Sequence, residues 1–147
     1  MFDLLHCDTR GPHKIPTYSC LHFFLIVVDD FTQCTLVFLM QLKSKVQHLS
    51  MSFVKFVQTQ FHTIIRSDTK TEFLSLQPFF TSCDIELQRT CVYTPQKNGV
   101  VEHKHRHILN VAWFLLFQSP VSLNFWGECI LITVYLINRT PSPLLSN

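Results

Sequence analysis

The sequence predicts an α/β protein in which helices flank a five-stranded mixed sheet. Three observations predict this class. Three strand-like runs open the chain, two further runs then alternate with segments of helical periodicity, and helical periodicity continues to the end. This order is typical of layered folds with helices packed on a sheet. A chain of 147 residues fits one domain and can bury a core without metal or disulfide staples.

The first three strands are expected at residues 4–7, 22–28 and 35–40. The first is an apolar run broken by Arg10, Gly11 and Pro12, which places Asp8 at its end. Polar residues 29–33 form the turn between the second and third strands, so the chain opens as a meander.

A helix should follow from Ser44, because Gln47 lies three residues later and completes a capping box. Its apolar residues recur at helical spacing and should face the sheet. They are Val46, Leu49, Phe53, Phe56, Val57 and Phe61. A helix–sheet layer is therefore expected on this face.

The middle of the chain alternates between strand-like and helix-like patterns of apolar residues. A short strand is expected at 63–67, ending at Asp68, followed by a helix at 72–81 around Pro78 and a fifth strand at 85–92. Loop formers at 94–99 separate this strand from the helices that follow.

The last third of the chain predicts two helices. One runs until Ser119 and Pro120, and its inward residues are Val101, His105, Ile108, Ala112 and Leu115. Ser122 can cap the second, which ends before Pro141. The inward residues of that helix are Phe125, Trp126, Cys129, Ile130, Thr133, Val134 and Ile137. We expect one domain over 1–140, with 141–147 beginning a linker.

Composition and charge add little about function. Hydrophobic residues make up 47% and charged residues 15%, which excludes a disordered chain, and a net charge of +2 does not by itself indicate nucleic-acid binding. The cysteines form no C-x-x-C pair or zinc-finger spacing, so we expect reduced thiols in a cytoplasmic or nuclear protein. They are Cys7, Cys20, Cys34, Cys83, Cys91 and Cys129. No secretory signal or run of membrane-spanning length is evident.

Three acids stand at predicted element boundaries: Asp8, Asp68 and Glu102. Strand ends and first helical turns often carry functional groups in α/β folds, although turn and capping roles also favour acids there. Asp29 and Asp30 form another acidic pair, which we interpret as structural because it lies in a turn.

Several segments in one order give the acids a context. They are LHCD with Gly11 and Pro12, IVVDDFT, RSD with TEF, YTPQKNGVVEHKHR, FWGE and YLINRTP. This series resembles the integrase catalytic core of copia-type LTR retrotransposons of plants, over essentially the whole chain. The resemblance implies a ribonuclease H-like fold and activity in DNA integration, namely 3′-end processing and strand transfer.

The resemblance also implies that Asp8, Asp68 and Glu102 are the catalytic acids. They would bind two Mg²⁺ or Mn²⁺ ions, with Asp8 bridging the pair. Carboxylates suit this role, because phosphodiester attack needs an activated nucleophile and a stabilised leaving oxygen, and hard cations that supply both prefer anionic oxygen ligands.

Basic residues gather around Glu102 and predict a DNA-facing surface, although a solvated basic helix face is the plainer interpretation. The DNA-binding candidates are Gln96, Lys97, Asn98, His103, Lys104 and Arg106. The expected partners are element ends and target DNA, in a homo-oligomer. A metal site of His103, His105 and His107 is disfavoured by their spacing around the helix. Trp113 and Trp126 are interpreted as core or partner-surface aromatics.

The chain departs from the family at several positions. Thr69 and Lys70 stand where the family has Asn-Gly after the second acid, and further differences occur at Asp84, Glu86, His103 and Trp113. These changes motivate the hypothesis of a copy that has lost activity. Two alternatives therefore stay open: a catalytically dead binding or oligomerisation module of the same fold, and a ribonuclease H-type nuclease. The chain lacks the Cys/His zinc-binding segment that usually precedes such a core and the DNA-binding region that usually follows it, so we expect it to be a fragment of a longer polyprotein or a truncated open reading frame.

Overall fold

A five-stranded sheet of order β3-β2-β1-β4-β5 forms the centre of the fold. The computed structural model describes residues 4–58, 64–67, 75–83, 85, 87–89 and 99–140. Its strands are β1 (Leu4–Arg10), β2 (Phe23–Asp29), β3 (Thr35–Met40), β4 (Ile64–Ser67) and β5 (Leu87–Arg89). Its helices are α1 (Lys45–Gln58), α3 (Gln77–Ser82), α4 (Gly99–Gln118) and α5 (Trp126–Arg139), with the 3₁₀ turn η2 (Leu123–Phe125) before α5.

The sheet is mixed. β1, β2 and β3 form an antiparallel meander, whereas β4 runs parallel to β1 and β5 parallel to β4. The antiparallel and the parallel parts of the sheet meet at β1, which is the central strand. The predicted α/β class and the opening meander are confirmed.

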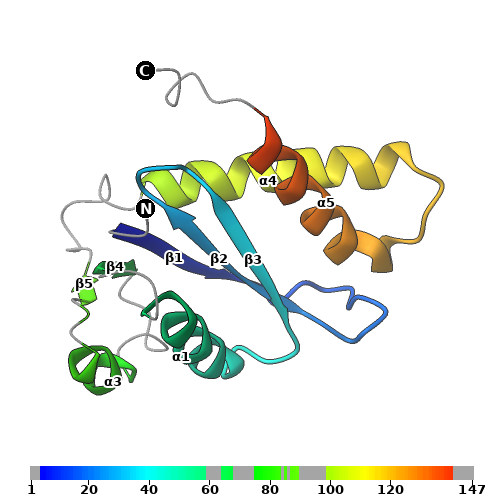
Figure 1. Ribbon diagram of the computed structural model, residues 1–147. Helices are drawn as coiled ribbons and strands as arrows, with labels where there is room; N and C mark the ends of the chain where they lie inside the picture. Colours follow the sequence, from blue (N-terminus) through cyan, green and yellow to red (C-terminus); the bar gives the residue numbers. More distant parts are fainter. Residues whose placement is uncertain are drawn as a thin grey trace.

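Helices cover both faces of the sheet. α4 and α5 lie on one side and α1 and α3 on the other (Figure 1). One core forms under α1 and α3 around Leu25 and Val27 of β2, and a second forms under α4 and α5 around Phe24, Ile26 and Val28. Alternation along β2 therefore supplies both cores.

Strand β1 is longer than its apolar run. It continues through Asp8 and ends at Arg10, so the expectation that the strand stops at Cys7 and leaves Asp8 at its end is wrong. Pairing explains the extension, because Asp8 lies opposite Ile26 and Arg10 opposite Phe24 on β2. The break falls at Gly11, whose φ is +126° and where a Cβ would lie 2.6 Å from the His22 carbonyl oxygen.

Helix α1 differs from its prediction in two ways. Phe56 is 68% exposed rather than inward, because at about 100° per residue it lies about 80° around the helix from the buried Val46. Among the described residues no hydrogen bond closes the predicted capping box, and Gln47 Nε2 instead donates to Ser75 Oγ at 2.6 Å. Phe61 lies outside the described residues.

The short helix α3 begins at Gln77, later than predicted, with residues 75 and 76 in a turn and 72–74 outside the described residues. Pro78 explains this, because proline lacks the N–H that a helix interior needs and is accommodated in the first turn. Among the described residues β5 covers Leu87–Arg89, within the predicted range of 85–92. Ile85 precedes it, and residues 86 and 90–92 are not described.

Helices α4 and α5 follow their predicted faces closely. α4 begins at Gly99, earlier than expected, and ends before Ser119 as predicted. Its inward face ends with Leu116, which is 2% exposed, whereas Leu115 is half-buried. Ser122 caps η2 rather than α5, accepting a hydrogen bond from Asn124 N–H. The predicted inward residues of α5 from Trp126 to Val134 are buried.

Two contacts fix α5 against the edge of the sheet. Asn138 accepts a hydrogen bond from Thr35 N–H at 2.9 Å and donates to the Thr35 carbonyl at 2.7 Å, so its amide replaces a neighbouring strand at the start of β3. Gly127 packs so closely on the edge strand β3 that a Cβ would lie 3.0 Å from Leu39 Cδ1. In the described part of the chain, no helix is long and apolar enough to cross a membrane.

Candidate functional site

Asp8 is a buried carboxylate held by three neighbouring groups. It is 3% exposed, and its Oδ1 accepts a hydrogen bond from Thr9 N–H at 2.7 Å. Its Oδ2 lies 3.1 Å from His105 Nδ1 and 3.5 Å from Arg10 Nε. A carboxylate is costly to bury unless it is paired and hydrogen-bonded. The contacts therefore hold a charge-bearing group at a fixed place beneath α4.

His105 is the contact that joins helix α4 to this carboxylate. It is 1% exposed, as predicted from its place on the inward face, and its ring meets the Phe24 ring edge-on with centroids 5.4 Å apart. No local pattern in the sequence predicts its contact with Asp8. The available signal was a buried histidine three residues after Glu102, because residues at this spacing share one side of a helix.

The end of β4 lies beside Asp8. β1 and β4 are parallel, and Cys7 pairs with Ser67, so the residues that immediately precede Asp8 and Asp68 are neighbours in the sheet. Asp68 itself lies outside the described residues.

Glu102 lies in the first turn of α4 and is exposed. It precedes His105 by three residues, a spacing that puts the two Cβ atoms about 5–6 Å apart on one side of the helix. Glu102 is therefore within one turn of the residue that contacts Asp8. A carboxylate in a first turn is also favoured by the helix dipole.

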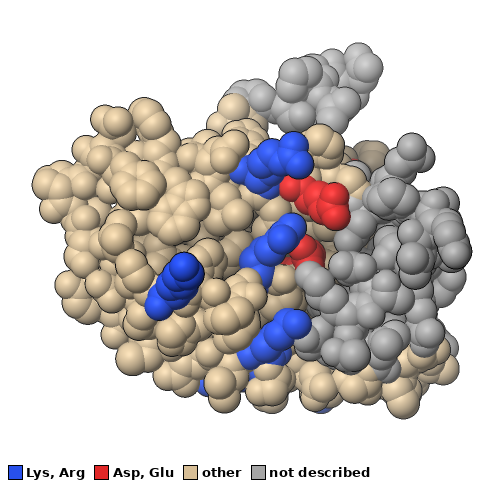
Figure 2. Space-filling view, turned by 180° about the vertical axis from the view of Figure 1, so that it is seen from behind, with Lys and Arg blue, Asp and Glu red and all other residues tan. Residues whose placement is uncertain are grey.

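The predicted DNA-binding residues of α4 lie on different sides of the helix. Arg106 lies one turn after Glu102 and both are exposed, whereas Lys104 lies about 160° around the helix from each of them. Burial lowers the pKa of Lys104, with the nearby Cys34 opposing the shift. His103 is exposed, and Gln96, Lys97 and Asn98 lie outside the described residues. Figure 2 shows basic side chains spread over this view of the surface, beside acidic atoms.

The acidic pair at the turn after β2 has structural partners, as predicted. Asp29 is buried and accepts hydrogen bonds from the backbone N–H and hydroxyl of Thr32. Asp30 Oδ1 lies 2.7 Å from Nε2 of the buried His6. Both carboxylates hold the turn and the start of β1 together.

The fit of this site to a divalent metal can be judged from its donors. Asp8 offers a carboxylate at a fixed position. Glu102 offers a second carboxylate, within one helical turn of His105, the residue that contacts Asp8. Hard cations such as Mg²⁺ prefer such oxygen ligands. Within the described part of the chain, no group of three or more His, Cys, Asp or Glu is arranged to hold a metal.

The neighbouring Cys7 is unsuited to be a ligand or nucleophile. Burial raises the pKa of its thiol to about 12, and the adjacent Asp8 adds to the rise. Its side chain faces the core under α1, on the opposite face from Asp8. Cys7, Cys20, Cys34 and Cys129 are free thiols, as predicted.

Known proteins place the chain in a family. It is 34% identical over 134 residues to the retrovirus-related Pol polyprotein from transposon RE1 of Arabidopsis thaliana, and 35% identical over 126 residues to that from transposon RE2. These matches cover 89% and 84% of the chain. The chain is homologous to copia-type plant retrotransposon Pol polyproteins. The Pol polyprotein from transposon TNT 1-94 of Nicotiana tabacum is also similar, at 29% identity over 97% of the chain.

The homologous region is a small part of each Pol polyprotein. The chain spans 9% of the RE1 and RE2 polyproteins and 11% of the TNT 1-94 polyprotein. No family model matches it. A chain of the simian T-cell lymphotropic virus intasome in complex with PP2A regulatory subunit B56 gamma has the same fold, with a TM-score of 0.72 at 14% identity. That match covers 95% of this Pol-related chain and 49% of the other, and shows that the two chains share a fold.

Proposed function

We propose that this Pol-related chain is the catalytic core of a retrotransposon integrase, which performs metal-dependent 3′-end processing and strand transfer of element DNA. The observation that carries the proposal is the buried Asp8, set beside the end of β4 and contacted by α4 one turn from Glu102. The homology to Pol polyproteins and the integrase-like fold support it.

Asp8, Asp68 and Glu102 are proposed as ligands of two Mg²⁺ or Mn²⁺ ions. When bound, such a pair activates the attacking oxygen and neutralises the charge that develops on the leaving oxygen. The chain itself contributes position. Thr9 N–H donates a hydrogen bond to one oxygen of Asp8, which helps to fix the position of that carboxylate, as efficient catalysis requires.

DNA is the proposed partner, both as element end and as target. Arg106 and His103 are exposed next to Glu102, where they can contact phosphates on the strand brought to the site. Gln96, Lys97, Asn98 and Lys104 are proposed to extend this contact. A homo-oligomer is proposed as the working form.

The activity is tested with the purified chain and a labelled duplex that ends in the element's terminal repeat. With Mg²⁺ or Mn²⁺ we expect a shortened strand and products joined to target DNA. Glu102→Gln should reduce both by about 10³-fold, because an ion that loses its ligand stabilises the transition state by several kcal/mol less. Asp30→Asn is the matched control, since it changes a carboxylate outside the site. Equal products with and without Glu102 would refute the assignment, and cleavage restricted to RNA–DNA hybrids would identify a ribonuclease H-type nuclease instead.

A second candidate is a catalytically dead DNA-binding module of the same fold. One observation favours it: Asp8 Oδ2 lies near both His105 and Arg10, so positively charged or hydrogen-bonding groups surround the oxygen that a metal needs. This candidate predicts duplex binding that is unchanged by Mn²⁺ and by Glu102→Gln. An affinity that rises with Mn²⁺ only when Glu102 is present would exclude it.

A further inference from the structure

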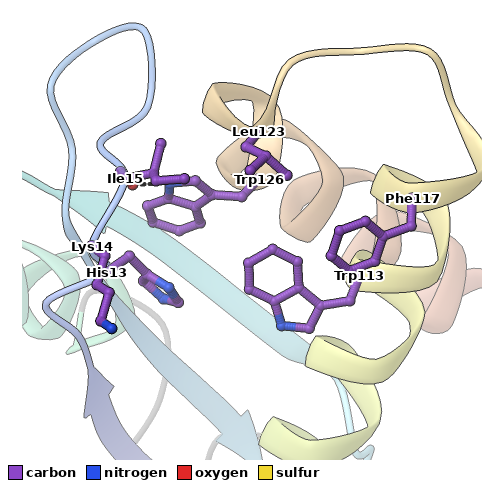
Figure 3. A pocket seen from close by; sticks show the side chains of 7 residues that line it. All are labelled: His13, Lys14, Ile15, Trp113, Phe117, Leu123 and Trp126. Carbon is purple, nitrogen blue, oxygen red and sulfur yellow. Dashed lines mark hydrogen bonds between the residues drawn. The ribbon is translucent and has the colours of Figure 1, made fainter.

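A second site lies at the far end of α4 from Glu102. The loop that follows β1, helix α4 and the start of α5 enclose a pocket of about 340 Å³ (Figure 3). This volume is at the lower end of the range for small-molecule sites. His13 and Lys14 come from the loop, Trp113 and Phe117 from α4, and Trp126 from α5.

Aromatic rings form most of the wall. The His13 ring lies 4.2 Å from the Trp126 ring, and the Trp113 ring stacks on Phe117 with centroids 5.8 Å apart. In Figure 3 the two indoles stand on opposite sides of an open space. Trp126 is 3% exposed and His13 packs against it, so the aromatic surface left for a planar ring is that of Trp113 and Phe117. Offset stacking there is a favourable arrangement of aromatic groups.

The loop is held in place before any ligand arrives. Trp126 Nε1–H donates to the Ile15 carbonyl at 2.8 Å, and Asn124 Nδ2–H donates to the Pro16 carbonyl at 2.8 Å. His13 N–H donates to the His22 carbonyl across the base of the loop at 2.8 Å. A pocket with fixed walls loses less conformational entropy when it binds a ligand.

Charge selects among ligands with planar rings. Lys14 is the charged residue among those that line the pocket, and burial lowers the pKa of His13, with His22 as a smaller cause, so that ring is mostly neutral at pH 7. A cationic ligand would be repelled by Lys14 despite the aromatic walls. A planar ring attached to an anion matches both features, and a nucleotide has that chemistry.

The position agrees with a DNA strand that also reaches Asp8. Trp113 follows His105 by eight residues of α4, which is about 12 Å along the helix axis. This is the length of about three to four nucleotides at a spacing of about 3.4 Å. Loop residues His13 and Lys14 also follow Arg10, which contacts Asp8.

We propose that the pocket between Trp113 and Trp126 binds one unpaired nucleobase of a DNA strand, with Lys14 contacting its phosphate. The inference rests on the proposed function, because the strand is the one brought to Asp8. The proposal gives Trp113 a ligand-binding role, whereas the sequence led us to interpret it as a core or partner-surface residue. Sequence tolerance is expected, since every base offers a flat face for stacking.

Tryptophan fluorescence reports on this site directly, because Trp113 and Trp126 are the two tryptophans of the chain. A thymidine strand of about eight nucleotides should quench the fluorescence in a saturable way. The same strand with abasic sugars keeps the phosphates and lacks the bases, so it should bind weakly and quench little. Equal quenching by the two strands, or none by either, would overturn the proposal.

Variants locate the binding. Trp113→Ala should weaken binding of a labelled thymidine strand about 5- to 150-fold, and Trp113→Phe should largely preserve it. Phe114→Ala is the matched control, because Phe114 is 63% exposed on the same helix and outside the pocket. Lys14→Ala should reduce the dependence of binding on salt by about one phosphate contact. A Trp113→Ala affinity equal to that of the Phe114→Ala control would contradict the assignment.

The outcome separates the two proposals. Metal-dependent cleavage of duplex ends without quenching by single strands would refute the base pocket and leave the integrase function standing. Quenching that depends on Trp113, in a chain that neither cleaves nor binds Mn²⁺, would refute catalysis and support the pocket.

Discussion

Strands β1 and β2 are neighbours in the sheet, yet they fill its two faces differently. From Phe23 to Val28, β2 is apolar on both faces, with Phe24 and Ile26 under α4 and Leu25 and Val27 under α1. β1 places Leu5 and Cys7 in the core under α1, but its other face carries His6 and Asp8, which are buried and polar.

The difference identifies the face that serves function. Buried polar groups contribute less to stability than apolar packing, and they require hydrogen-bonding partners. A strand without a functional role can therefore be apolar on both faces, as β2 is. β1 instead directs its polar face toward α4, where Asp8 meets His105. The comparison therefore predicts that substitutions on the apolar face change stability most, and that those on the polar face change function.

The largest effect on stability is expected on the apolar face. Leu5→Ala should lower the free energy of unfolding by about 2–5 kcal/mol, because Leu5 is 1% exposed and its truncation leaves a cavity. Urea denaturation followed by circular dichroism measures this. Leu131→Ala is the matched control on the exposed side of α5 and should change stability by less than about 0.5 kcal/mol. Equal losses in the two variants would contradict the assignment of the core.

A smaller effect is expected from the partner of His6. Asp30→Ala should cost about 1–3 kcal/mol, because the buried imidazole loses the acceptor that lies 2.7 Å from its Nε2. Asp30→Asn keeps a carbonyl oxygen at that place and should cost less. The same denaturation measurement distinguishes them, and an Asn variant as unstable as the Ala variant would show that the hydrogen bond is not what matters.

The smallest effect at neutral pH concerns Cys7, whose contribution changes only at high pH. Its native pKa of about 12 lies above the ordinary value of 9, so the folded chain keeps a proton that the unfolded chain loses. Stability from this group is complete below pH 9 and is lost as the pH rises toward 12. Cys7→Val should make the fall of stability with pH in this window shallower, by up to about 1.4 kcal/mol per pH unit. Identical slopes would show that the thiol titrates normally.

Much of the fold could be predicted because periodicity reports burial directly. The inward face of α5 was predicted at nearly every position, since its apolar residues repeat with the helical period over the whole element. β3 was predicted with its bounds. The end of β1 was missed because Asp8 and Arg10 are polar, and their place in the strand depends on pairing with β2.

The candidate site could be predicted only in part. Ordered motifs pointed to Asp8, Asp68 and Glu102, and the structure places the first beside the end of β4 and the last one turn from His105. The contact between Asp8 and His105 joins residues about a hundred positions apart, and no local pattern carries that information. The aromatic pocket was missed for the same reason, because its walls come from three separate elements.

Metal binding at Asp8 is the central claim, and a titration with Mn²⁺ tests it most directly. A ligand that binds only the folded state raises the melting temperature in a saturable way. We expect such a rise for the unmodified chain, and its loss in Asp8→Asn and in Glu102→Gln, with Asp30→Asn behaving like the unmodified chain. A rise of equal size in all four proteins, or in none of them, would contradict the claim.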